Sequence, residues 1–188
     1  MKIGILGGTF NPIHLGHLVL AEQVREELSL EKVIFIPSNF PPHKENGDIV
    51  ASQDRFKMLE IAIKGNKYFD ISDLEIRRKG KSYSVDTLKA LKSKFSADDL
   101  YFITGSDVLN YLNDWKDINE IFSLAKFVVA TRPGYALDNL PSSVIAIPIK
   151  AVDISAYQIR QYIKNGRSIK YLVPEGVIEY IYEKGLYR

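Results

Sequence analysis

Segments typical of buried strands alternate along this chain with segments typical of amphipathic helices, and this order constrains the fold more than any other feature. Apolar runs of strand length lie at Lys2–Leu6, Val33–Pro37, Leu100–Thr104, Phe127–Ala130 and, more weakly, Val144–Pro148. Apolar residues at helical spacing separate them, for example over Leu15–Leu28 and Val85–Phe95. Because strand and helix alternate at βαβ spacing, we expect an α/β fold with a mostly parallel sheet and helices on both faces.

The less regular segments add four expectations. Phe69–Ile76 alternates like a further strand, and Ser38–Ala51, rich in proline, asparagine and charge, has the length of a functional loop. The pattern D-x-x-E predicts a capping box at the start of a helix over Ile118–Ala125. An S-x-x-Q pattern beginning at Ser155 predicts another, at the first of two final helices.

Composition narrows the class of protein. A length of 188 residues is typical of a single domain, which we expect to span residues 1–188. The net charge of +2 is too balanced for a general nucleic-acid or membrane binder, so we expect small-molecule partners. No run approaches the ~18 apolar residues of a membrane span, and the start lacks a signal-peptide layout, so a cytoplasmic location is expected. The lack of cysteine excludes disulfides, thiolate catalysis and Cys-ligated zinc.

A glycine-rich turn follows the first predicted strand. Gly7 and Gly8 end that strand before a helix, which places the turn at the carboxyl edge of the sheet, where open α/β sheets bind their ligands. The dinucleotide pattern G-x-G-x-x-G is not present, because Gly4, Gly7 and Gly8 include no pair two residues apart. The run GKS at 80–82 is not a phosphate-binding P-loop, because Glu75 stands where its first glycine is required.

Two histidines begin the helix after this turn. His14 and His17 stand three residues apart, so both side chains can point the same way beside backbone N–H groups that favour anions. Imidazoles in that position can donate hydrogen bonds to phosphate oxygens. Two alternatives stay open from the residues alone: the histidines serve as polar caps, or they bind zinc, which needs a third ligand such as His43.

Six segments in order carry a resemblance to a known family. They are GGTFNPIHLGH (7–17), PPHK (41–44), SYSVDTL (82–88), TGSD (104–107) followed by Trp115, FVVATRPGY (127–135) and ISAYQIR (154–160). The first resembles the signature of the HxGH nucleotidyltransferases, which phosphopantetheine adenylyltransferases, cytidylyltransferases and class I aminoacyl-tRNA synthetases share. Together the segments resemble the bacterial nicotinate-nucleotide adenylyltransferases, and SYSVDTL with Trp115 is the more specific part.

The resemblance implies a Rossmann-like fold, ATP with Mg²⁺, and transfer of AMP to nicotinate mononucleotide. The products would be nicotinate adenine dinucleotide and pyrophosphate, in NAD biosynthesis. The attacking group would be a phosphate monoester, whose second pKa of about 6 leaves it largely ionised at neutral pH. No general base is then needed, which suits a sequence without an evident base dyad.

The resemblance also assigns site residues. The catalytic set would be His14, His17, Lys44 and Arg160. The ATP site would comprise Gly8, Thr9, Phe10, His14, His17, Gly105, Asp107, Arg132, Ser155 and Arg160. Without the resemblance, Lys44 would be read as a solvated lysine and Asp107 as a turn or cap residue. Tyr157 departs from the pattern, because relatives often carry Thr or Ser there, and this puts a small hydroxyl contact in doubt.

The acceptor site implied by the resemblance comprises Lys44, Ser84, Thr87 and Trp115. Ser84 is expected to cap a helix whose first turn includes Thr87, so that free N–H groups and the helix dipole favour the nicotinate carboxylate. Thr87 would help to hold that carboxylate and Trp115 would stack on the pyridine. Ordinary capping and a buried tryptophan are the alternatives, and Asp86 would repel the ligand unless its side chain faces away.

Two other functions stay open. One is a related transferase with another acceptor, such as phosphopantetheine, which would have no use for SYSVDTL and Trp115. The second is a catalytically silent nucleotide-binding regulatory module, against which His14, His17, Lys44 and Arg160 argue. We expect ATP and nicotinate mononucleotide as partners, no nucleic acid and no membrane, and we allow for a homo-oligomer.

Overall fold

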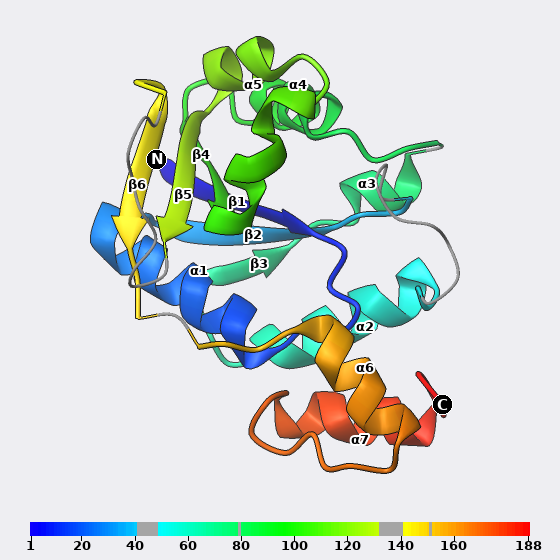
Figure 1. Cartoon of the computed structure of the whole chain (residues 1–188). Helices are drawn as coiled ribbons and strands as arrows, with labels where there is room; N and C mark the ends of the chain where they lie inside the picture. The colour runs from blue at the N-terminus through cyan, green and yellow to red at the C-terminus, as the bar shows by residue number, and fades with distance from the viewer. Residues whose placement is uncertain (41–48, 79, 132–140, 151) are drawn as a thin grey trace.

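The computed structural model describes residues 1–40, 49–78, 80–131, 141–150 and 152–188. Within these ranges six strands form one sheet in the order β3-β2-β1-β4-β5-β6, and every neighbouring pair is parallel. Figure 1 shows the sheet between two layers of helices. The expectation of an α/β, Rossmann-like fold with helices on both faces is confirmed.

The side on which the chain adds new strands changes at the centre of the sheet, between β1 and β4. The strands are β1 (Lys2–Gly8), β2 (Lys32–Pro37), β3 (Phe69–Ile71), β4 (Asp99–Gly105), β5 (Lys126–Thr131) and β6 (Val144–Pro148). After β1 the chain first adds strands on one side and then, from β4, on the other. Open α/β sheets bind ligands at such a switch point, beyond the carboxyl ends of the two strands, which here are Gly8 and Gly105.

Helices cover both faces because successive strand residues point to opposite sides. Val33 and Phe35 join one core cluster, while Ile34 and Ile36 join the other. The first cluster packs against α1 (Leu15–Leu28), α2 (Ser52–Ile63), α6 (Ala156–Lys164) and α7 (Glu175–Glu183). The second packs against α4 (Ser84–Lys94), η2 (Ser106–Asp114), a 3₁₀ segment, and α5 (Ile118–Leu124).

The segment Phe69–Ile76 differs from its prediction. Only Phe69–Ile71 pairs with β2, and α3 (Leu74–Arg77) follows as a short helix. Asp73 redirects the chain: its carbonyl accepts from the Arg77 N–H and its carboxylate accepts from the Arg77 side chain. The segment η2 was not predicted either, because a nine-residue stretch with a kink at Tyr111 has no regular helical period.

The predicted capping boxes are wrong at both helices. Asp117 lies at the N-cap of α5 in the left-handed region, with φ of 52°, and its side chain makes no capping hydrogen bond. Ser155 is the N-cap of α6, again without a side-chain cap bond. Helix α4 begins at Ser84, so its N-cap is Tyr83 rather than Ser84. Sequence patterns for caps locate a helix start to within a residue but do not fix the side-chain rotamer.

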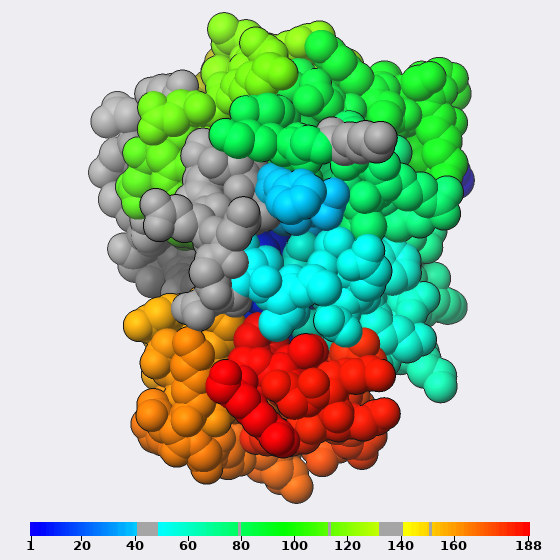
Figure 2. Space-filling view, turned by 90° about the vertical axis from the view of Figure 1, so that its right-hand side faces the viewer, coloured from blue at the N-terminus to red at the C-terminus, as the bar shows by residue number. Residues whose placement is uncertain are grey.

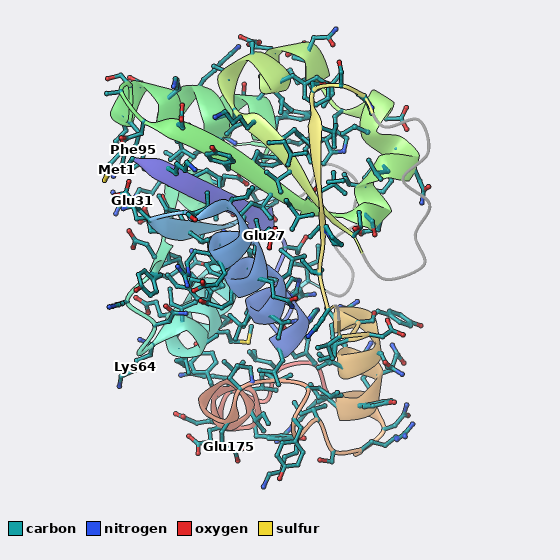
Figure 3. The ribbon with its side chains drawn as sticks, turned by 90° about the vertical axis from the view of Figure 1, so that its left-hand side faces the viewer. Met1, Glu27, Glu31, Lys64, Phe95 and Glu175 are labelled. Carbon is teal, nitrogen blue, oxygen red and sulfur yellow. The ribbon has the colours of Figure 1, made fainter. Side chains whose placement is uncertain are left out.

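The edge opposite the switch point holds the starts of the central strands. Met1, Glu31 and Phe95, labelled in Figure 3, gather there. The amino group of Met1 binds Asp98 at 2.7 Å, which joins the start of β1 to the approach to β4. Among the helices of the described residues, none is both long and apolar enough to cross a membrane.

Candidate active site at the switch point

The turn after β1 is compact because an aromatic ring lies over a glycine. Phe10 has a positive φ of 48° and is 2% exposed. A Cβ on Gly8 would lie 2.9 Å from the Phe10 ring, so a larger residue at position 8 would displace it. The Phe10 ring also contacts the His17 ring edge-on, with centroids 5.1 Å apart. The turn therefore positions a histidine as well as exposing backbone at the end of β1.

The two histidines are stacked at the start of α1. His14 is the N-cap residue, and its ring centroid lies 3.7 Å from that of His17 with 29° between the planes. The backbone N–H of His14 donates to Nδ1 of His17 over 3.3 Å. Because that nitrogen accepts, a neutral His17 carries its proton on Nε2, which is then a donor. The side-by-side arrangement predicted for the pair is present.

Gly16 makes this stacking possible. A Cβ at position 16 would lie 3.0 Å from Nδ1 of His14 and 3.5 Å from the carbonyl oxygen of Val152. The glycine between the histidines therefore leaves room for the His14 ring, whereas the contact with Val152 would be an ordinary one. The H-x-G-H pattern thus has a packing reason for its third residue.

Arg160 reaches the turn from α6. Its Nη1 donates to the carbonyl of Asn11 over 2.9 Å, and its guanidinium lies 5.7 Å from the centre of the Tyr157 ring. Its Nε is buried and has no hydrogen-bond partner among the described residues. Tyr157, the departure from the family pattern, therefore lies beside the cation as an exposed ring, 62% accessible.

Asn11 is fixed by contacts from distant parts of the chain. Its side-chain Oδ1 accepts from the backbone N–H of Val50 at 3.2 Å and from the Tyr187 hydroxyl at 2.9 Å. Burial raises the pKa of Tyr187, which stays a neutral donor at physiological pH. The turn is thus tied to the entry of α2 and to the C-terminal residues.

The predicted ATP residues on β4 and α6 lie around the same edge. The carboxylate of Asp107 lies over Gly105, where a Cβ would come within 2.7 Å of Oδ1, and Asp107 is exposed. Gly105 ends β4 beside β1. Ser155, also exposed, begins α6. The described members of the predicted ATP set therefore border one region, formed by the ends of β1 and β4 and the starts of α1 and α6.

The described members of the predicted acceptor set, Ser84, Thr87 and Trp115, lie on the face of the sheet that α4 covers. Trp115 packs edge-on against Phe102 and Phe127, and its indole Nε1 is buried with no partner among the described residues. The Asp86 carboxylate lies 4.0 Å from the Lys116 ammonium. Both side chains are partly exposed, so this ion pair is weak, and repulsion of an anionic acceptor by Asp86 stays open. Ser84, the first residue of α4, is half-buried.

Thr87 was expected to hold the acceptor, and in the structure its hydroxyl binds a buried glutamate. It is 1% exposed, and its hydroxyl donates to Oε1 of Glu75 over 2.6 Å. The hydroxyl oxygen also accepts from Nη2 of Arg78 at 3.1 Å. Since a hydroxyl has one proton, Thr87 can donate to a ligand only by releasing Glu75. A direct contact between Thr87 and the acceptor stays a prediction.

Burial of Glu75 makes stability depend on pH. Desolvation raises the pKa of this carboxyl above its ordinary value of 4.5, with hydrogen bonds from Thr87 and Ser82 opposing the shift. The folded state therefore holds the proton more tightly than the unfolded state does. The resulting stabilisation is complete below pH 4.5 and is lost as pH rises through the raised pKa.

We therefore expect Glu75→Gln to change how stability varies with pH. Relative to this variant, the parent protein should lose free energy of unfolding as the pH is raised from below 4.5 to neutrality. Urea denaturation at a series of pH values measures the difference. Glu60→Gln, at an exposed carboxylate paired with Lys57, is the control and should show no such trend. A difference in stability between the parent and Glu75→Gln that stays constant with pH would contradict the assignment.

Three residues named in the sequence analysis cannot be placed. Lys44 and Arg132, and the alternative zinc ligand His43, lie outside the described residues. Their roles therefore stay predictions.

Four residues that contact the candidate site were not predicted from the sequence: Asn11, Gly16, Arg55 and Glu75. Arg55 carried a signal, because it stands four residues before Leu59 on the buried stripe of its helix. A charged residue on such a stripe needs buried partners. The position of Arg55 could therefore have marked it as a residue with a structural or functional role.

Comparison with known proteins places the chain in a family. Residues 5–162 match the family described as cytidylyltransferase-like. A probable nicotinate-nucleotide adenylyltransferase of Geobacillus thermodenitrificans is 45% identical over 186 residues, covering 99% of this chain and 86% of the relative. One from Desulfitobacterium hafniense (strain DSM 10664 / DCB-2) is 44% identical over 198 residues, covering 100% and 96%. The chain belongs to the nicotinate-nucleotide adenylyltransferase family.

Solved structures agree with the fold of a nicotinate-nucleotide adenylyltransferase. The chain is similar to the nicotinic acid mononucleotide adenylyltransferase of Plasmodium falciparum, solved as a complex with NaAD, with a TM-score of 0.82. That match covers 99% of this chain and 97% of the other at 20% identity. The six-segment resemblance seen in the sequence is therefore confirmed at the level of family and fold.

Proposed function

We propose that this nucleotidyltransferase transfers AMP from ATP to nicotinate mononucleotide, giving nicotinate adenine dinucleotide and pyrophosphate in NAD biosynthesis. The observation that supports it best is the stacked pair His14–His17 at the switch point, with Arg160 bonded to the same turn. That arrangement gathers three nitrogen-bearing side chains beside a helix N-terminus, where anions are favoured. The named relatives act on the same class of nucleotide.

In the proposed reaction, a phosphate oxygen of nicotinate mononucleotide attacks the α-phosphorus of ATP in line. A P–O bond forms to the acceptor while the bond to the leaving pyrophosphate breaks, and the pyrophosphate takes the electron pair. Alignment of two bound phosphates supplies about 7 to 11 kcal/mol of the barrier reduction. Donors aimed at the phosphate oxygens stabilise the charge of the transition state. We assign this role to His14, His17 and Arg160, with Lys44 as a further proposed cation.

The other proposed contacts follow from position. Gly8, Thr9 and Phe10 would lie along the nucleotide, Gly105 and Asp107 would contact the adenosine, and Ser155 would meet the phosphates at the start of α6. Arg132 is retained as a proposed phosphate cation. Ser84, Thr87 and Trp115 would form the acceptor side together with Lys44. The Trp115 Nε1, buried and without a partner among the described residues, offers a donor on that side.

Mg²⁺ is proposed to enter with ATP. Among the described residues no group of three His, Asp or Glu side chains could hold a metal ion. Mg²⁺ commonly keeps several waters and binds substrate phosphates with few protein ligands, so these residues fit delivery as a nucleotide complex. When bound, the ion would neutralise charge on the triphosphate. EDTA should therefore abolish turnover, and added Mg²⁺ should restore it.

A panel of acceptors tests the function. Pyrophosphate release from ATP is measured with nicotinate mononucleotide, nicotinamide mononucleotide and phosphopantetheine, each with and without protein. We expect rapid release with nicotinate mononucleotide. Release with phosphopantetheine alone would point to the related transferase, and no release with any acceptor would favour the silent regulatory module.

We further propose that residues 1–188 act as one nucleotidyltransferase domain in the cytoplasm. The two core clusters that sandwich one sheet support the single domain. A cytoplasmic location would place the protein with ATP, and neither nucleic acid nor membrane is expected as a partner. A homo-oligomer is left open, and light scattering measures it directly.

A further inference from the structure

A buried arginine joins three chain segments at the candidate active site. Arg55 lies on α2, the cyan helix above the C-terminal residues in Figure 2, and it is 1% exposed. Its guanidinium donates to three backbone carbonyls, those of Thr9 at 2.8 Å, Asn39 at 3.2 Å and Val50 at 3.1 Å. One side chain therefore links the turn after β1, the residues after β2 and the entry of α2.

Within the described ranges, the hydrogen bonds of the Arg55 guanidinium all go to neutral carbonyls, and no acidic side chain forms an ion pair with it. Burial lowers the pKa of Arg55, and the negative charges of ionised Tyr187 and Glu75 oppose that shift. A guanidinium nonetheless stays protonated in proteins. Among the described residues, Arg55 is thus a buried cation without a paired anion, an arrangement that costs free energy.

The contact with Thr9 also orients the turn. In a trans peptide the carbonyl and the next N–H point in opposite directions. Because the Thr9 carbonyl points at Arg55, the N–H of Phe10 points away from it. Phe10 holds its positive φ at this position, so the bond from Arg55 supports a backbone conformation that residues other than glycine adopt rarely.

We propose that Arg55 is the buried counter-charge of the bound polyphosphate and a positioning residue for the turn after β1. The inference rests on the proposed function, in which that turn binds the phosphates of ATP. The nucleotide would supply the negative charge that no ion pair of the described residues gives to Arg55. Buried charges are weakly screened by salt, so the guanidinium acts on the phosphates without touching them.

Three variants separate charge from hydrogen bonding. Arg55→Lys keeps the positive charge but loses the guanidinium that donates to three carbonyls. Arg55→Gln loses the charge and keeps an amide donor. Lys57→Gln removes one charge from the exposed side of the same helix and is the control. Calorimetry measures the Kd of inorganic triphosphate and, separately, of adenosine, which has no charge.

The charge of Arg55 should matter for triphosphate alone. We expect Arg55→Gln to raise the triphosphate Kd by about tenfold or more and Arg55→Lys by less than about threefold. Adenosine binding should change by less than about twofold in every variant, and the control should match the parent for both probes. Equal weakening by Lys and Gln would overturn the counter-charge role. Loss of adenosine binding equal to the loss for triphosphate would show general damage to the site and also overturn it.

The parent protein provides a second test that does not depend on how the variants fold. Nitrogen-15 NMR follows the exchange of the Arg55 Nε proton with water. Triphosphate should slow this exchange and adenosine should not, and an unchanged rate would overturn the proposal. Failure of the proposed function is distinguishable, because the parent would then bind triphosphate as described yet release no pyrophosphate with any acceptor.

Discussion

Replacing His14 or His17 by alanine is expected to lower kcat by about 10²- to 10³-fold, the scale observed when one donor to a transition-state oxyanion is removed. The reason is local: the two rings are stacked 3.7 Å apart at the start of α1, and His17 carries its proton on the nitrogen that the helix backbone leaves available. KM for ATP should change less than kcat, since the donors matter most when charge develops. Steady-state kinetics with saturating ATP and acceptor measures both.

Both histidines form a capping box at the start of α1, and two comparisons decide whether they also act chemically. Glu27→Ala, at an exposed position of the same helix, should leave kcat unchanged. Gly16→Ala keeps both histidines but brings a Cβ to 3.0 Å from the His14 ring, so it too should lower kcat. Circular dichroism confirms that each variant is folded. Near-normal turnover in a folded His14→Ala or His17→Ala protein would return that histidine to the role of a cap.

Nicotinate mononucleotide should exceed nicotinamide mononucleotide in kcat/KM by roughly tenfold to a thousandfold. The helix dipole contributes about 0.3 to 1 kcal/mol and each charge-assisted hydrogen bond about 1.5 to 3 kcal/mol in favour of a carboxylate. The first turn of α4 supplies N–H groups that make no side-chain capping hydrogen bond, and the Asp86 carboxylate in that turn lies 4.0 Å from the Lys116 ammonium. Competition between the two acceptors in one assay measures the ratio. Equal or better use of the amide would show that the acceptor assignment is wrong while leaving adenylyl transfer intact.

Thr87→Ala should narrow this gap, for a reason that the structure supplies. Its hydroxyl donates to Glu75, so the variant leaves a buried carboxylate short of a donor near the turn that would hold the nicotinate carboxylate. The Glu75 carboxylate would then repel nicotinate mononucleotide, which carries a carboxylate, but not nicotinamide mononucleotide, which carries a neutral amide. Thr87→Ser, which keeps the hydroxyl, is the matched control and should retain the preference. The variant should also lose about 1 to 3 kcal/mol of stability, and chemical denaturation separates that loss from the kinetic effect.

The parts of the fold that could be predicted are those in which local pattern and burial agree. The strands at Val33–Pro37 and Leu100–Thr104 are buried on both faces, so they appear as continuous apolar runs in the sequence. Helix Leu15–Leu28 was predicted with the bounds that the structure gives, because its apolar residues recur at helical spacing over a long stretch. The spacing of His14 and His17 predicted that both side chains can point the same way, and the structure shows their rings stacked.

The sequence predicts local structure poorly where a contact between distant residues overrides a local pattern. Phe69–Ile76 alternates throughout, yet only its first three residues pair with a neighbouring strand, and α3 begins after Asp73. The hydroxyl of Thr87 donates to Glu75, twelve residues away, a contact that the sequence did not predict, while the contact between Thr87 and the acceptor stays a prediction. Neither partner could be inferred from spacing, because spacing predicts only which residues share a face of one element.

Local sequence was enough to establish the class of fold, the position of the turn after β1 and the family to which the chain belongs. These follow from hydrophobic periodicity and short motifs, which act over a few residues of the chain. The groups that support that turn became visible only once distant segments were packed together: Arg55 beneath three carbonyls, Asn11 bonded to Tyr187, and Gly16 against the His14 ring. Buried polar groups need hydrogen-bond partners, and the packing of distant segments selects which groups supply them.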